Sequence, residues 1–291
     1  MKLAIVVLNY INYGDTIVCV DKLLEIGAKA DIVIVDNASP NESFSILNEK
    51  YKKCKNVEII ASERNGGYST GNNLGVRHSI DKFQPDAVAI MNPDVVIPNA
   101  NVIERLYSKL FSSDKYGIIG GVAITNNKFD INRCCWNIPK GIDVVVTHFI
   151  KSKNQRSGID YNWLGNGLIQ TECVVGCFFM IKADIFCKLG FFDENVFLYN
   201  EENILGIKLK KIGLKAVVSL EDFYYHNHDY GNNEDCGFIN KVLATKNTFQ
   251  SRKYMCKKYY SSLLLPLLYG VEGANRIYLA GCYLWKRILR R

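Results

Sequence analysis

The stretch AVAIMNPDVVI, residues 87–97, joins a continuous apolar run to a polar turn. Ala87–Met91 has the hydrophobic pattern of a strand that is buried on both faces. The turn Asn92-Pro93-Asp94 follows this strand directly and presents one carboxylate, which the preceding proline helps to fix. A lone carboxylate at the end of a strand is a suitable ligand for Mg²⁺ or Mn²⁺, although an aspartate that only caps a turn would look the same.

Three earlier apolar runs end in a similar way. Leu3–Val7 leads into Asn9, Asp31–Asp36 leads into Asn37, and Asn56–Ala61 leads into residues 63–67, Glu-Arg-Asn-Gly-Gly. Ligands of open α/β sheets bind outside the carboxyl ends of the strands. Any single polar loop is ordinary, but four such loops at one edge predict a ligand site there.

Segments with helical periodicity separate these strands. Their apolar positions are Val18, Val20, Leu23, Leu24 and Ile26 in the first segment, and Phe44, Ile46, Leu47 and Tyr51 in the second. Alternation of strand and helix at roughly 25–30 residues per unit predicts βαβ crossovers. We therefore expect an α/β fold with a mainly parallel sheet flanked by helices.

The second half of the sequence is less regular. We expect strands at Ile118–Ile124, Cys173–Ile181 and Ala216–Tyr225, and helices at Ala183–Leu189, Asn203–Lys211 and Phe238–Tyr260. Residues 261–285 are apolar, but Pro266, Glu272, Asn275 and Arg276 interrupt them, which disfavours a membrane-spanning helix. Two interpretations stay open: a helix that lies on a membrane surface, with Lys286, Arg287, Arg290 and Arg291 at its end, or a helix that covers the core.

The composition is that of an ordinary globular protein. Hydrophobic residues make up 48% of the 291 residues and charged residues 22%, and the net charge is +7. This charge suits an anionic ligand or membrane surface but not a dedicated DNA-binding protein, so we expect no nucleic-acid partner. The ten cysteines form no CxxC pair, and the apolar run at the N-terminus is short for a signal peptide. We expect a cytoplasmic chain with reduced thiols.

Several common nucleotide motifs are missing. No GxGxxG follows the first strand, and the sequence contains neither a GxxxxGK[ST] phosphate loop nor a GxSxG elbow. A Rossmann dinucleotide site and a serine hydrolase are therefore disfavoured.

Five segments, in this order, resemble the landmarks of bacterial family-two glycosyltransferases, and in particular their rhamnosyltransferase branch. These are VVLNY, VDNAS, NGGYSTGNNLG, IMNPDVVI and GFFDENVFLYNEENILGIKLKKIG. The resemblance covers roughly residues 3–230 and implies an A-type glycosyltransferase fold. It also implies a nucleotide-sugar-binding half at residues 1–115, an acceptor and catalytic half at 116–236, and a C-terminal helical segment at 237–291 that is able to contact a membrane.

The resemblance also implies a donor site. Asp94 would bind a divalent metal, Mg²⁺ or Mn²⁺, on the donor diphosphate, and His226 would complete the metal shell, with His228 as second choice. Asn92 would contact the sugar or ribose. The other donor-binding residues would be Asn9, Asp36 and Asn37 at the base, Asn65 in the third loop, and Gly67, Gly71 and Asn73, where the backbone approaches base and ribose; glycines at such a turn suit close approach.

Catalysis would fall to Glu201-Glu202, which replace the Glu-Asp pair of the family. Glu202 would be the base, although its longer side chain moves the carboxylate, and Ile204 stands where a later aspartate is usual. Acidic residues at a helix N-terminus also occur without any catalytic role. The implied reaction is inverting transfer from dTDP-rhamnose or a UDP-sugar to a saccharide or lipid-linked acceptor in the synthesis of cell-surface polysaccharide. The alternatives are a sugar-phosphate nucleotidyltransferase and a silent sugar-nucleotide-binding protein.

Overall fold

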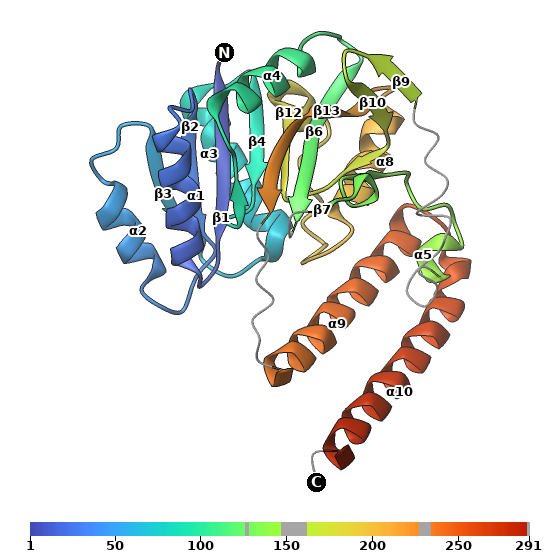
Figure 1. Cartoon of the computed structure of the whole chain (residues 1–291). Coiled ribbons are helices and arrows are strands. Elements are labelled where there is room, and N and C mark those ends of the chain that lie inside the picture. Colours follow the sequence, from blue (N-terminus) through green and yellow to red (C-terminus); the bar gives the residue numbers. More distant parts are fainter. Residues whose placement is uncertain (126–127, 147–161, 227–233, 290–291) are drawn as a thin grey trace.

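The computed structural model describes residues 1–125, 128–146, 162–226 and 234–289. Its centre is a sheet whose first four strands, in the order β3-β2-β1-β4, are all parallel (Figure 1). Their bounds are β1 Leu3–Asn9, β2 Asp31–Asp36, β3 Val57–Ala61 and β4 Ala87–Met91. The predicted α/β class and the four N-terminal strands are confirmed, with ends within two residues of those expected.

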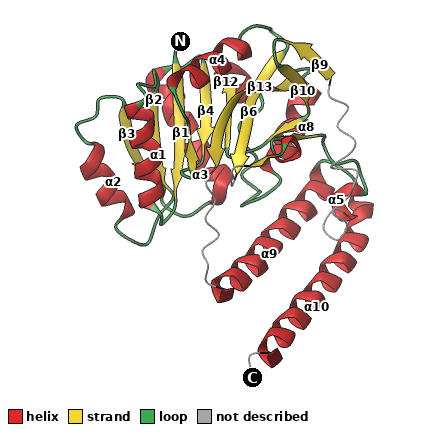
Figure 2. Cartoon of the chain, viewed as in Figure 1, coloured by secondary structure: helices red, strands yellow, loops and turns green. Residues whose placement is uncertain are grey.

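Helices cover both faces of this sheet, which explains why its strands are apolar throughout (Figure 2). On one face the core contains residues of α1 (Tyr13–Glu25), α2 (Ser43–Tyr51) and α4 (Ala100–Leu110). On the other face it contains residues of α3 (Gly67–Phe83), α7 (Ala183–Lys188) and α8 (Glu201–Lys211). Two residues assigned to the helix faces from sequence are exposed, Val18 at 60% and Phe44 at 39%, because the buried stripes of α1 and α2 lie at Cys19-Val20-Leu23 and Leu47-Tyr51.

The second half continues the sheet with mixed strand directions. Strand β12 (Phe178–Lys182) lies antiparallel between β4 and β6 (Tyr116–Thr125). Strand β13 (Lys215–His226) runs parallel to β6, and β10 (Leu168–Thr171) and β9 (Asn162–Gly165) extend the edge. Short strands β5 (Val95–Val96) and β7 (Lys128–Phe129) pair with β13 and β6.

One predicted strand was wrong. Cys173–Ile181 is divided into β11 (Cys173–Val174), which pairs with β8 (Cys135–Trp136), and β12. Between them the backbone turns, and the amide of Val175 donates to the carbonyl of Cys134. The sequence did not predict the hairpin of β9 and β10. This hairpin turns through Gly165, Asn166 and Gly167, which all have positive φ.

Two boundaries matter for the site. Helix α8 begins at Glu201, two residues before the predicted Asn203, so both glutamates lie in its first turn. Strand β13 includes His226 as its last residue, whereas the sequence placed this histidine after the strand.

The C-terminal helices α9 (Glu234–Lys258) and α10 (Leu265–Leu289) extend away from the sheet as a pair (Figure 1). They share a small core, Val144 and Val145 of α5 (Asp143–Val146) with Phe249, Cys256 and Leu268. Two further short helices in the described part of the chain are η1 (Ile131–Arg133) and η2 (Ser262–Leu264). None of the helices within the described residues combines the length and the apolar character needed to cross a bilayer.

Candidate functional site

The ends of β1 and β2 meet in a buried hydrogen-bond network. The Nδ2 of Asn9 donates to Oδ1 of Asp36 at 2.7 Å, and Oγ1 of Thr16 donates to Oδ1 of Asn9 at 2.8 Å. The hydroxyl and the amide of Ser39 donate to the two oxygens of Asp36. The structure thus brings Asn9 and Asp36 together as predicted, but their side chains are at most 2% exposed and bind each other. Their hydrogen bond therefore joins the end of β1 to the end of β2.

A second network joins the ends of β2 and β3 to the start of α3. The Nδ2 of Asn37 donates to Oδ1 of Asn65 at 3.0 Å and to the carbonyl of Gly67 at 3.2 Å. Oδ1 of Asn65 also accepts from the amide of Gly67, and Ser62 donates to Asn37. Asn37 and Asn65, predicted separately, therefore act as a pair that fixes the loop.

Gly67 and Gly71, which the sequence predicts to lie close to a ligand, are both approached closely by the chain itself. A Cβ at Gly67 would lie 2.1 Å from the carbonyl oxygen of Phe197, and one at Gly71 would lie 2.5 Å from Cδ1 of Leu8. Gly67 also has φ +82°, which strongly favours glycine. These glycines let α3 pack against β1 and the loop before α8.

Asn73 is likewise engaged inside the protein. Its side chain is fully buried and exchanges two hydrogen bonds of 3.0 Å with the backbone of Phe192. The same Nδ2 donates to Oε1 of Glu194. These side-chain hydrogen bonds join α3 to the loop before α8, so Asn73 has a structural role.

The Asn92-Pro93-Asp94 turn is held from two sides. The amide of Asn92 donates to the carbonyl of Cys177 at 2.8 Å, and the amide of Val95 donates back to the carbonyl of Asn92. Strand β5 then pairs with the end of β13, so that Val95 lies opposite His226. As a result, Oδ2 of Asp94 lies 3.2 Å from Nε2 of His226.

Asp94 and His226 are suitable metal ligands in type and position. The side chains are 13% and 18% exposed, so they are partly shielded yet reachable. A carboxylate and an imidazole suit Mn²⁺, and two protein ligands leave positions for phosphate oxygens and water. Within the described residues no group of three or more His, Cys, Asp or Glu side chains gathers as a complete metal shell. The second-choice His228 lies outside the described residues.

The two glutamates lie at the N-terminus of α8, after Tyr199 and Asn200, which both have left-handed backbones (φ 72° and 71°). Oε1 of Glu202 accepts from the amide of Gly176 at 3.2 Å. Burial raises the pKa of Glu202, and burial together with the charge of Glu202 raises that of Glu201. Glu201 is only 5% exposed, and its Oε1 has no hydrogen-bond partner among the described residues, whereas Glu202 is half-buried.

Gly176 and Cys177 connect these two groups. The amide of Gly176 donates to Glu202, and the carbonyl of Cys177 accepts from the amide of Asn92 in the Asn92-Pro93-Asp94 turn. Burial, together with the charges of Asp94 and Glu202, raises the pKa of the Cys177 thiol to about 12. The base candidate and the metal-ligand candidate therefore flank one two-residue segment.

Sequence reasoning missed three members of this arrangement. Ser39 lies in the VDNAS segment, and Tyr68 lies in NGGYSTGNNLG, where its hydroxyl donates to the carbonyl of Gly176 at 2.6 Å. Both residues lie in segments that carry the family resemblance, but the sequence analysis gave neither of them a role. Gly176 was hidden in an apolar run that reads as one strand; a Cβ there would lie 2.7 Å from Oε1 of Glu202.

The loop before α8 is also bound to α9. The carboxylate of Asp193 accepts from the hydroxyls of Tyr254 and Tyr259 and from Nζ of Lys258, all at 2.7–2.9 Å. Although burial opposes it, these hydrogen bonds hold the pKa of Asp193 well below its usual range. Nδ2 of Asn200 donates to Oγ of Ser251 at 2.6 Å. The C-terminal segment thus supports the loop that leads to the glutamates.

Comparison with known sequences identifies relatives. The low-salt glycan biosynthesis hexosyltransferase Agl10 of Haloferax volcanii is 28% identical over 200 residues, which cover 69% of this chain and 59% of Agl10. The rhamnosyltransferase WbbL of Escherichia coli is 22% identical over 206 residues, which cover 66% of this chain and 71% of WbbL. The chain therefore spans less than two thirds of Agl10.

Solved structures share the fold. GalNAc-T7, solved with UDP, GalNAc and Mn²⁺, superposes with a TM-score of 0.61 at 15% identity, over 84% of this chain and 48% of its own. The mannosyltransferase PcManGT from Pyrobaculum calidifontis, in complex with GDP-Man and Mn²⁺, superposes with a TM-score of 0.57 at 13% identity, over 99% and 79%. The expected A-type glycosyltransferase fold is thereby confirmed. The model of the family described as glycosyl transferase family 2 matches residues 4–189, well over half of the chain, so this protein belongs to that family.

Proposed function

We propose that this protein transfers a sugar, with inversion, from a nucleoside diphosphate donor to an acceptor hydroxyl. The observation that carries the proposal is the segment Gly176-Cys177, which binds Glu202 on one side and the Asn92-Pro93-Asp94 turn on the other. A base for the acceptor and a site for the leaving diphosphate must lie on opposite sides of the reacting carbon, and two fixed groups joined by one short segment meet this need. Membership of the family supports the proposal.

Asp94 and His226 would hold the divalent metal, Mg²⁺ or Mn²⁺, with donor phosphate oxygens in the remaining positions. Their side chains fit this role because they supply one hard oxygen and one nitrogen ligand from two paired strands. The bound metal would act as a Lewis acid that stabilises negative charge on the diphosphate. Both solved structures named above contain Mn²⁺, which supports this assignment.

Glu202 is the proposed base, and Glu201 a neighbour that tunes it. Glu202 takes the proton of the acceptor hydroxyl while the acceptor oxygen bonds to the anomeric carbon. The bond from that carbon to the diphosphate oxygen breaks at the same time, and its electrons leave with the nucleoside diphosphate from the opposite face. Burial raises the pKa of Glu202, and burial together with the charge of Glu202 raises that of Glu201, so the pair takes up a proton more readily than exposed carboxylates do.

We infer dTDP-rhamnose or a UDP-sugar as donor and a saccharide or lipid-linked acceptor of cell-surface polysaccharide synthesis. The names of the relatives, a glycan-biosynthesis hexosyltransferase and a rhamnosyltransferase, support the donor class. A panel of nucleotide sugars tests it. Release of nucleoside diphosphate with Mn²⁺, but not with EDTA, is expected for one or a few donors.

The variant Asp94→Ala is expected to lose at least a hundredfold in this release. Asp86→Ala is the matched control, since Asp86 precedes the same strand at its other end and binds the hydroxyl of Tyr107. Near-normal turnover by Asp94→Ala would contradict the proposed site. Pyrophosphate release from a sugar phosphate and a nucleoside triphosphate would instead favour the nucleotidyltransferase, and donor binding without any release would favour a silent binding protein.

Helix α10 supports a peripheral contact with the inner face of the cytoplasmic membrane. Leu267, Tyr278 and Trp285 follow one another on one side of the helix and are 48%, 57% and 65% exposed. The sequence after them is basic (Lys286, Arg287, Arg290 and Arg291), which suits anionic lipid. Co-sedimentation with vesicles that contain anionic phosphatidylglycerol is expected, and it is expected to weaken in Tyr278→Asp. Val18→Asp, an exposed apolar position on α1, serves as control; equal binding by both variants would exclude this face of α10.

A further inference from the structure

Strand β13 contains a large bulge between its two paired parts. Val218 lies opposite Gly120 of β6, and Phe223 lies opposite Val122. One residue of β6, Gly121, therefore faces the four residues Ser219–Asp222. A Cβ at Gly121 would lie 2.6 Å from the carbonyl oxygen of Asp222, so this glycine gives the bulge its room.

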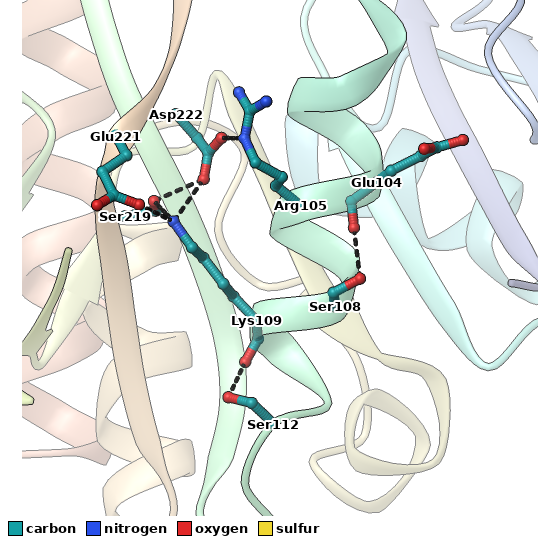
Figure 3. Close-up of polar contacts among 8 residues, drawn as sticks. All are labelled: Glu104, Arg105, Ser108, Lys109, Ser112, Ser219, Glu221 and Asp222. Carbon is teal, nitrogen blue, oxygen red and sulfur yellow. Dashed lines mark hydrogen bonds and ion pairs between the residues drawn. The ribbon is translucent and has the colours of Figure 1, made fainter. Parts of the chain in front are cut away.

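The bulge is tied to α4 by a compact polar cluster (Figure 3). Asp222 is fully buried; its Oδ1 accepts from Nε of Arg105 at 2.6 Å, and its Oδ2 accepts from Oγ of Ser219 at 2.6 Å. Nζ of Lys109 donates to Oδ2 of Asp222 at 3.0 Å and to Ser219 and Glu221 at 2.8 Å. Lys109 thus connects three residues of the bulge to one helix.

The strand that leaves this bulge ends in the metal site. Phe223–Tyr225 pair with β6, and His226 then lies opposite Val95, next to Asp94. Strand β5 has only two residues, so its ladder with β13 is too short to fix the register firmly. A slip of one residue turns every side chain of a strand to the other face of the sheet. Such a slip would turn His226 away from Asp94.

We propose that Asp222, held by Arg105 and Lys109, is a positioning residue for the metal site: it fixes the length of the bulge and so sets the phase at which His226 meets Asp94. This inference rests on the proposed function of Asp94 and His226. The charged cluster is otherwise costly, because the fully buried carboxylate needs two cations to compensate it. Asp222 lies four residues before His226 in the same strand. Positioning of His226 is therefore a role for this costly cluster beyond stability of the fold.

The test is direct Mn²⁺ binding, measured from the EPR signal of the free ion in the presence of UDP, with dTDP and GDP in parallel. Asp222→Asn keeps the volume of the side chain and removes its charge. We expect its affinity for Mn²⁺ to fall about tenfold, in the range found when groups that orient metal ligands are changed. Arg105→Gln, at a half-exposed position, is expected to move the affinity in the same direction by a smaller factor.

Glu272→Gln is the matched control. Glu272 is also a buried carboxylate with two cationic partners, Lys253 and Arg276, but it lies in the C-terminal helices. A lower melting temperature with unchanged Mn²⁺ affinity is expected for it, which separates loss of stability from loss of positioning.

Folded Asp222→Asn that binds Mn²⁺ within twofold of the wild type would overturn the inference. If Asp222→Asn does not fold, unchanged Mn²⁺ affinity in Arg105→Gln would have the same meaning. Wild-type protein that binds no Mn²⁺ with any of the three nucleotides would refute the proposed metal site itself, so the two failures are distinguishable.

Discussion

Asp193 lies near the start of the loop before α8, and the Glu201-Glu202 pair follows at its end. The fold shifts the pKa values of these carboxylates in opposite directions. Asp193 receives hydrogen bonds from Tyr254 and Lys258 of α9 and from Tyr259, which directly follows this helix, and these bonds lower its pKa. Glu201, which is buried, and Glu202, which is half-buried, follow a few residues later, and their pKa values are raised.

This difference in pKa indicates a structural role for Asp193 and a chemical role for the two glutamates. A carboxylate whose acceptor positions are filled stays ionised and has little tendency to take up a proton. A pair in which burial and mutual repulsion disfavour the charge is poised to accept one. Asp193 therefore anchors the loop, and the glutamates are the candidates for proton transfer.

The largest expected effect comes from removing the base. Glu202→Gln is expected to lower turnover at least a hundredfold, about 2.7 kcal/mol in activation free energy, while donor binding persists. Glu201→Gln should cost much less, because buried Glu201 acts on the reaction only through its neighbour. Steady-state rates with the nucleotide sugar that the donor panel identifies measure both. Equal losses in the two variants would mean that the glutamates act as one unit.

The anchor should show the reverse pattern. Asp193→Asn removes the charge that Lys258 binds and the acceptor shared by two tyrosine hydroxyls, and we expect it to lower the free energy of unfolding by about 2 kcal/mol. Urea denaturation measures this loss. Turnover should fall much less than in Glu202→Gln, because Asp193 affects the reaction only by holding the loop before α8 in place. If Asp193→Asn is as stable as the wild type but inactive, Asp193 takes part in the reaction, and the proposed difference between Asp193 and the glutamates is wrong.

The pH dependence of stability should have opposite signs at the two places. The folded glutamate pair binds protons more tightly than the unfolded chain, so its contribution is present below the ordinary pKa of 4.5 and is lost as pH rises above it. Asp193 binds protons less tightly when folded, so its contribution is present above the ordinary value of 3.8 and is lost as pH falls below it.

Melting temperatures of three proteins test these signs. The double variant Glu201→Gln, Glu202→Gln should gain on the wild type between pH 5 and pH 8. Asp193→Asn should approach the wild type as pH falls toward 3. A constant difference over both ranges would show that these carboxylates are not perturbed.

The smallest expected effect is at Tyr68, which supports the glutamates through Gly176. Tyr68→Phe removes one hydrogen bond to the carbonyl of Gly176 and should cost about 1 kcal/mol in stability. Turnover should fall by only a few fold, since the bond of Glu202 to the amide of Gly176 remains. Tyr13→Phe, at a partly buried tyrosine of α1 that packs against the apolar core, is a suitable control. A loss at Tyr68 as large as that of Glu202→Gln would place its hydroxyl in the reaction.

The sequence predicted the parts of the fold that local pattern determines. The four N-terminal strands are apolar throughout because both faces are buried, and this pattern is visible without knowing the fold. Cys173–Ile181 has the same pattern but was wrong as one strand. Its turn depends on contacts with Cys134 and Asn92, which are distant in sequence.

The site was predictable only in part for the same reason. Asp94 and His226 were assigned to one metal site from the resemblance, and the pairing of β5 with β13 brings them to 3.2 Å. Gly67 and Gly71 do mark close approach, but a glycine does not tell whether the approaching atoms belong to a ligand or to the chain. Here they belong to Phe197 and Leu8.

The position of β12 between β4 and β6 has a consequence for how the chain is made. When the first four strands leave the ribosome, β4 has one edge without a partner until residues 178–182 follow. An apolar strand with an open edge readily pairs with other chains. The N-terminal part with its four parallel strands should therefore need protection during synthesis, and a fragment that ends near residue 115 should aggregate when expressed alone.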